Sequence, residues 1–147
     1  MKISKNGQYA LLSVADLAIH SQGGHESLAH IAERQHIEPR YLGQIFFALK
    51  NAGLVKSVRG KTGGYFLSRP AEELTAGEVI RAVEGDLAPT QCCIDEGESK
   101  SCKTYYGCIT RVLWQQIAHE INDTLDRITI ADIIAEYQKG AYKDDAQ

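Results

Sequence analysis

The chain of 147 residues is 44% hydrophobic and 24% charged and has a formal net charge of −3, which is ordinary for one globular domain with an extension. It contains no apolar run of about 18 residues and no signal-peptide pattern, so neither a membrane span nor secretion is expected. We therefore expect a cytoplasmic protein with reduced thiols, in which structural disulfides are the less favoured role for the cysteines.

Three helices are predicted in the first part of the chain. The first is expected over residues 9–19. Ser27 is placed to cap a short second helix over residues 28–36. Pro39 suits the first position of a third helix, which Gly53 closes. The first helix carries an apolar stripe of Leu12, Ala15, Ala18 and Ile19. The third repeats apolar residues that should face a core, namely Leu42, Ile45, Phe46 and Leu49.

The hydrophobic periodicity then changes to that of strands. Residues 54–60 and 64–68 are short β-type runs around the turn GKTGG, which predicts a hairpin with a basic tip. Thr75 and Glu78 form a capping-box pattern at the start of a further helix.

Two helices are predicted in the C-terminal part. The longest helix of the chain is expected over residues 108–127, and Thr129 with Asp132 should cap a last, shorter helix. One side of the long helix is apolar, formed by Val112, Leu113, Ile117, Ile121 and Leu125. The complete order predicts a mainly α fold, a winged helix-turn-helix with a small β-hairpin wing and a long C-terminal helix.

The start of the third helix and the tip of the hairpin are the candidate DNA-binding surfaces. A helix in the major groove presents its N-terminal residues to base edges, which here are Arg40, Tyr41 and Gln44. Gln44 can form two hydrogen bonds with adenine, and Arg59 at the hairpin tip suits the narrow minor groove. Contacts with phosphates are expected from three lysines, Lys5, Lys56 and Lys61.

Charge supports this interpretation only weakly. Residues 1–70 contain nine Lys/Arg and four Asp/Glu, whereas residues 71–147 contain seven and fifteen. A basic half is typical of polyanion binding. A winged-helix module that binds proteins is the alternative, because fold does not imply function. An enzyme is not expected, since no nucleophile–base pair and no C-x-x-C motif is visible.

All four cysteines lie within residues 91–108. The close pairs typical of structural zinc sites are absent, and the stretch is too polar and turn-rich to form a core. A loop that surrounds one inorganic cofactor would explain why the thiols are grouped. The spacing leaves three roles open with equal weight, namely an iron–sulfur cluster, zinc and redox-active thiols. The cysteines are Cys92, Cys93, Cys102 and Cys108.

Four segments together resemble the IscR/NsrR/CymR family of bacterial winged-helix regulators, and they cover about residues 1–135 in the family's order. They are MKISKNGQYALLSVADLA, RYLGQIFFALKNAGLVKSVRGKTGGYFLSRP, LTAGEVIRAVEG and CITRVLW. The resemblance implies a transcription regulator, expected here to be a repressor. It also implies a homodimer formed through the long helix, bound to a palindromic double-stranded DNA operator.

The resemblance further implies an iron–sulfur cluster that controls DNA affinity, with Cys92, Cys102 and Cys108 as its ligands by motif position. The fourth ligand is open, because Arg111 replaces the family's histidine and Gln8 its N-terminal carboxylate, and neither side chain is a suitable ligand. The candidates for this position are Cys93, a solvent or small-molecule ligand, and a group from the other subunit. The cluster type, [2Fe–2S] or [4Fe–4S], stays undecided. On the third helix, Gly43 stands where the family often has an acidic residue.

The expected domain boundaries follow from these assignments. Residues 1–85 are expected to form the winged helix-turn-helix DNA-binding domain, and residues 86–108 the cysteine-rich cluster-binding loop. Residues 109–140 are expected to contain the dimerisation helix and the final helix. Residues 141–147 are expected to be a flexible tail.

Overall fold

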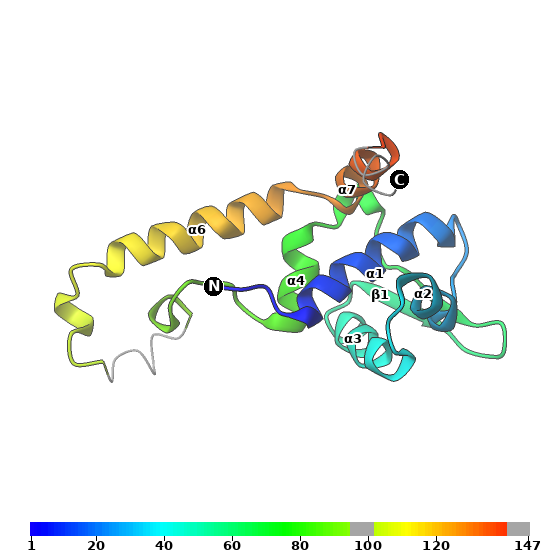
Figure 1. The fold of residues 1–147 in the computed structure, drawn as a ribbon, viewed down its shortest axis with the longest axis horizontal. Coiled ribbons are helices and arrows are strands. Elements are labelled where there is room, and N and C mark those ends of the chain that lie inside the picture. The colour runs from blue at the N-terminus through cyan, green and yellow to red at the C-terminus, as the bar shows by residue number, and fades with distance from the viewer. Residues whose placement is uncertain (95–101, 141–147) are drawn as a thin grey trace.

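The computed structural model describes residues 1–94 and 102–140 (Figure 1). The tail expected over residues 141–147, and the middle of the expected loop over 86–108, lie outside the described residues. The α-helices are α1 (Lys5–Ser21), α2 (Leu28–Gln35), α3 (Pro39–Asn51), α4 (Ala76–Glu84), α6 (Arg111–Arg127) and α7 (Ile130–Gln138). The strands are β1 (Val55–Val58) and β2 (Gly64–Leu67), and short 3-10 turns are η1 (Ala71–Glu73), η2 (Gln91–Cys93) and η3 (Tyr105–Gly107).

Most of these α-helices begin at a residue whose side chain accepts hydrogen bonds from free backbone amides of the first turn. Ser27 accepts from the amide of His30 at 3.1 Å. Both predicted capping boxes, Thr75 with Glu78 and Thr129 with Asp132, are confirmed. Such caps satisfy donors that have no partner within the helix. They therefore fix where the chain enters each helix.

The core lies between α1, α3 and α4, with the hairpin closing one side. The predicted buried face of α3 is confirmed, since Leu42, Ile45, Phe46 and Leu49 are all buried. The apolar stripe of α1 is not the side that faces the core, because Leu12 is 42% exposed. The fully buried residues of α1 are Ala10, Ser13, Val14 and Leu17. Because α1 carries apolar residues on two sides, periodicity alone does not show which side is buried in the core.

The hairpin has the predicted antiparallel arrangement, with Val55 opposite Leu67 and Val58 opposite Gly64. The segment before α2 pairs with its second strand through two hydrogen bonds between Glu26 and Tyr65, of 2.9 and 2.8 Å. Gly64 allows this approach, because a Cβ there would overlap the carbonyl of Glu26. The wing is thereby attached to the helix-turn-helix.

Helix α6 extends away from the helical domain, and η3 lies at its far end (Figure 1). It begins at Arg111 and not at Cys108 as predicted, since the backbone of Cys108 is extended. With 17 residues it is as long as α1. No residue of α6 is buried. In the part of the chain that the structure describes, no helix is both long and apolar enough to cross a membrane.

The chain returns to the domain after α6. Ala76 donates to the carbonyl of Ile128, and Ile130 donates to that of Leu74, each at 2.8 Å. The side chain of Ile130 is fully buried in the core. Helix α7 is therefore part of the N-terminal domain, while the first half of α6 stands free of it.

Candidate DNA-binding surface and cysteine loop

The exposed face of α3 carries Arg40, Gln44, Phe47 and Asn51, opposite the buried face. At about 100° per residue, these four positions fall within an arc of about 60°. Arg40 and Gln44 are exposed as the sequence predicts. Phe47 was missed by the sequence reasoning, although its side chain is 65% exposed. Its helical spacing from Arg40 and Gln44 was the signal that could have identified it.

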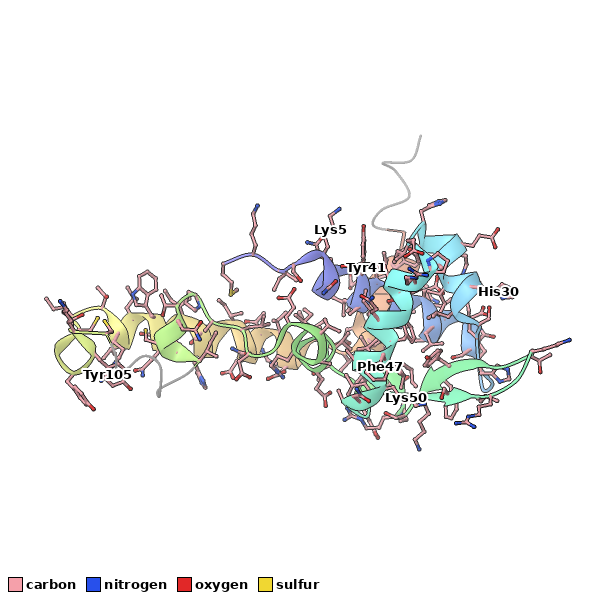
Figure 2. All side chains as sticks on the ribbon, turned by 90° about the horizontal axis from the view of Figure 1, so that it is seen from below. Lys5, His30, Tyr41, Phe47, Lys50 and Tyr105 are labelled. Atoms are coloured by element: carbon pink, nitrogen blue, oxygen red, sulfur yellow. The ribbon has the colours of Figure 1, made fainter. Side chains whose placement is uncertain are left out.

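Tyr41 is less free than Arg40 and Gln44. Its hydroxyl donates to the side-chain carbonyl of Asn6, and its ring packs edge-on against Tyr9 with centroids 5.8 Å apart. The ammonium of Lys5 lies 5.7 Å from the Tyr9 ring centroid. Figure 2 shows Lys5 near Tyr41. Tyr41 thus attaches the start of α1 to the start of α3 and brings Lys5 beside the exposed face.

The wing presents the other predicted cations. Lys56, Arg59 and Lys61 are all exposed, and none of them forms a salt bridge with another described residue. Lys50 near the end of α3 donates to the hydroxyl of Ser57 on β1 at 2.7 Å. This contact joins the third helix to the wing.

A buried carboxylate fixes α2 against α1. The Asp16 side chain is 1% exposed and forms a salt bridge with Arg34 at 2.7 Å. It also accepts a hydrogen bond from Gln35 at 2.7 Å. Burial acts to raise the pKa of Asp16, but the hydrogen bonds from Arg34 and Gln35 outweigh it, so the pKa lies below its ordinary value. Arg34 also binds Glu26 at 3.0 Å, next to the wing.

The four cysteines occupy two places along the chain. Cys92 and Cys93 are in η2, where the Thr90 hydroxyl lies 3.0 and 3.4 Å from their sulfurs. Cys93 lines a pocket of about 570 Å³ beside the middle of α6. Cys102 and Cys108 flank η3, near the start of α6. All four thiols are free and at least partly exposed.

The thiols of Cys102 and Cys108 are shifted toward the thiolate form. A hydrogen bond with the Thr104 hydroxyl lowers the pKa of Cys102, and one with the Thr110 hydroxyl lowers the pKa of Cys108. The charge of Cys108 acts in the opposite direction on Cys102.

Arg111, at the position of the family's histidine, is held by Tyr105. Its guanidinium lies 4.4 Å from the ring centroid and donates to the Tyr105 carbonyl at 2.5 Å. Tyr105 is 9% exposed, an exception to the expectation that this stretch contains no core residue. No sequence pattern predicts the contact between Arg111 and Tyr105. The positive charge of Arg111 lies near enough to contribute to lowering the pKa of Cys108.

No group of three or more His, Cys, Asp or Glu side chains that could hold a metal ion is formed by residues 1–94 and 102–140. Cys92, Cys102 and Cys108 are thus not gathered around one point in this conformation. The donor chemistry fits an iron–sulfur cluster, because thiolates are its usual ligands and all three thiols are free. Ligation by all three would require the ends of the loop to approach.

Comparisons with known proteins agree with this geometry. A family model described as Rrf2, iron-dependent transcriptional regulator, matches residues 3–136. The HTH-type transcriptional regulator IscR of Erwinia tasmaniensis is 40% identical over 134 residues, which is 91% of this chain and 79% of the relative. The solved structure of T. potens IscR has a TM-score of 0.75 and 35% identity, covering 96% of this chain and 91% of that one.

A second solved structure is similar to the same extent. CymR, described as the global cysteine regulator of B. subtilis, has a TM-score of 0.73 and 36% identity. The match covers 92% of this chain and 98% of that one. The predicted winged-helix fold and the resemblance to the IscR/NsrR/CymR family are confirmed by these matches.

Proposed function

Since the chain belongs to the Rrf2 family of iron-dependent transcriptional regulators, we propose that it is a homodimeric repressor that binds a palindromic operator. We further propose that an iron–sulfur cluster in the Cys92–Cys108 loop controls its operator affinity. The general function of the chain is transcription regulation, not enzymatic catalysis. The observation that carries the DNA-binding proposal is the exposed face of α3 next to a wing whose cations form no salt bridge with another described residue.

Two different chemistries meet on this surface. Arg40 and Gln44 project from the start of α3, where a helix in the major groove contacts base edges. Arg59 and Lys61 project from the wing tip, where a guanidinium can enter the minor groove and an ammonium can bind phosphate. The Lys50–Ser57 hydrogen bond connects the helix to the wing. One protomer would therefore read one half-site.

Binding of duplex DNA at several salt concentrations tests this proposal. The logarithm of the association constant should fall linearly with the logarithm of salt concentration, by a slope of about −0.9 per phosphate contact. Lys61→Ala should reduce that slope by about 0.9 and weaken all sequences equally. Gln44→Ala should cost about 1–3 kcal/mol on the operator only. Binding without salt dependence, or unchanged affinity in both variants, would contradict the assignment.

The homodimer is supported by the surface of α6. Val112 is 71% exposed and Leu113 50% exposed, and Ile109 just before the helix is 96% exposed. Apolar side chains grouped on a projecting helix are typical of a protein interface. A second copy of the helix would cover them. A two-fold symmetric dimer then requires an operator with two inverted half-sites.

The cluster is supported by the donor set. Cys92, Cys102 and Cys108 would hold it, and Cys93 is the candidate for the fourth position. When bound, an iron–sulfur cluster supplies a centre that responds to redox state and to iron supply. Arg111 cannot serve as a ligand because it stays protonated, but its charge favours an anionic thiolate at Cys108. The residues of the chain thus stabilise the ligands in the form that binds iron.

Regulation would act through contacts between the loop, α6 and α4. Asn122 of α6 donates to the carbonyl of Leu87 at the start of the loop, at 2.9 Å. Asn122 also accepts from Arg81 of α4 at 2.9 Å, and Asp126 accepts from the same guanidinium at 2.5 Å. Closing the loop would therefore shift α4 relative to α6. A ligand changes affinity only through its different free energies in the two conformations.

Thiol or zinc sensing through the same cysteines is the second candidate function. It is favoured by the four free thiols, by the lowered pKa of Cys102 and Cys108 and by the similarity to a regulator described as controlling cysteine. Protein purified without oxygen should be analysed for iron, acid-labile sulfide and zinc. Iron and sulfide in matching amounts, lost in Cys102→Ala and Cys108→Ala, support the cluster. Zinc alone, or no metal after reconstitution, supports the alternative.

A further inference from the structure

We propose that Phe47 determines operator specificity by contacting the methyl group of a thymine in each half-site. This inference rests on the proposed DNA-binding function and deepens it. Phe47 is in the third turn of α3, and Figure 2 shows it near Lys50, toward the end of the helix opposite Tyr41. No base contact was assigned to it by sequence reasoning.

Phe47 lies on the exposed face of α3 and not in the core. Its neighbour Phe46 is fully buried, whereas Phe47 is 65% exposed. It lies one turn after Gln44 and within the same narrow arc as Arg40. An apolar ring exposed to water is normal at a single surface site. Here it stands on the same face of α3 as Arg40 and Gln44, which would enter the major groove.

Gly43 leaves the position one turn before Phe47 without a side chain. Side chains on a helix lean toward its N-terminus, so the Phe47 ring is directed over the positions three and four residues earlier, which are Gln44 and Gly43. A Cβ at Gly43 would have one near neighbour, a Leu28 methyl carbon at 3.8 Å. The surface beside Phe47 is therefore open. Without a side chain at Gly43, a base can approach the flat side of the ring.

The chemistry of the groove identifies the ligand. The thymine methyl is the one apolar group that base pairs present in the major groove, and apolar side chains including phenylalanine contact it. Arg40 and Gln44 would supply hydrogen bonds to neighbouring bases. A ring on the same face as these side chains adds a preference for thymine that polar side chains do not provide. A protein partner is the other possible occupant, and the following test separates the two.

The experiment begins with an operator selected from random duplex DNA by the wild-type protein. Each thymine of one half-site is then replaced by deoxyuridine, which lacks only the methyl group. At one position this should weaken binding about fourfold, the equivalent of about 0.8 kcal/mol for one buried methyl group. Phe47→Ala should bind the two duplexes equally. Phe47→Leu, which keeps an apolar side chain, should retain a preference for thymine.

Three results would overturn the inference, and they are distinguishable. If the wild type selects no operator, the proposed function fails and this inference fails with it. If the wild type selects an operator but no deoxyuridine weakens binding, only the thymine contact is wrong. If Phe47→Ala keeps the wild-type affinity and thymine preference, Phe47 is a contact for another partner. Circular dichroism of both variants confirms that they are folded, which is expected because the side chain is exposed.

Discussion

Glu84, the last residue of α4, binds Ser4, the residue that precedes α1. One carboxylate oxygen of Glu84 lies 2.5 Å from the backbone nitrogen of Ser4 and 2.5 Å from its hydroxyl, and both groups donate to it. The two residues are 80 positions apart in the sequence. The helix that contacts α6 is thereby joined to the start of the helix that carries Lys5. A movement of α4 would reach the DNA-binding surface through this contact.

Replacing Glu84 by alanine should lower the free energy of unfolding by about 1 kcal/mol. The estimate corresponds to the loss of a helix-capping interaction at a partly exposed site. Urea unfolding followed by circular dichroism measures it. Glu72→Ala removes an exposed carboxylate from η1 and serves as the control. Equal stability of the two variants would mean that the Glu84–Ser4 contact contributes nothing.

Gly7 lies beneath the same carboxylate, and a Cβ there would overlap Glu84. Gly7→Ala should therefore destabilise the protein, although alanine is the better helix former by about 1 kcal/mol. In the Glu84→Ala background the same change should cost less, because the Cβ would then meet only the Ile3 Cγ2 atom, at 2.9 Å. A double-mutant cycle of urea unfolding measures this coupling. Additive effects would show that Gly7 is not required for the contact.

The buried pair of Asp16 and Arg34 should make stability depend on acid. Because the pKa of folded Asp16 lies below its ordinary value of 3.8, its contribution is complete well above that pH and is lost as pH falls through the folded pKa. Asp16→Asn should cost about 2 kcal/mol at pH 7, less than for a fully buried pair, since Arg34 is partly exposed. The difference from wild type should shrink below about pH 4. A constant difference from pH 7 to pH 3 would contradict this.

The dimer interface is tested by a charge on α6. Leu113→Glu should convert the dimer to a monomer, because burying a carboxylate without a partner costs several kcal/mol. Sedimentation velocity measures the change. Gln44→Glu adds the same charge at an exposed polar site of α3, outside the proposed interface, and should stay dimeric. A wild-type monomer at micromolar concentration would contradict the proposed interface itself.

Local features were predictable from the sequence, and long-range pairs were not. The capping boxes and the buried face of α3 depend on residues three or four apart, so their patterns are visible in the chain. The contacts Tyr41–Asn6 and Arg34–Asp16 join separate helices, and no local pattern in the sequence identifies these residues as partners. Phe47 is an intermediate case. Its helical spacing was available, but an apolar residue beside Phe46 was not considered for a DNA contact.

The cysteine loop was predictable as a group of thiols but not as a geometry. The sequence places the four cysteines within residues 91–108. The structure places Cys93 beside the middle of α6 and Cys108 just before its start. The distance between Cys93 and Cys108 cannot be predicted from their spacing in the sequence, because this distance depends on how η2 packs against α6.

We propose that binding of the iron–sulfur cluster controls the affinity of the protein for its operator. The most direct measurement is operator titration of protein purified without oxygen, before and after removal of iron, with iron and sulfide determined in both samples. Removing iron should change the operator affinity of the wild type at least several-fold. The same treatment should leave the operator affinity of Cys102→Ala unchanged. Equal operator affinity of the two wild-type forms, with iron and sulfide confirmed in the first, would contradict the claim.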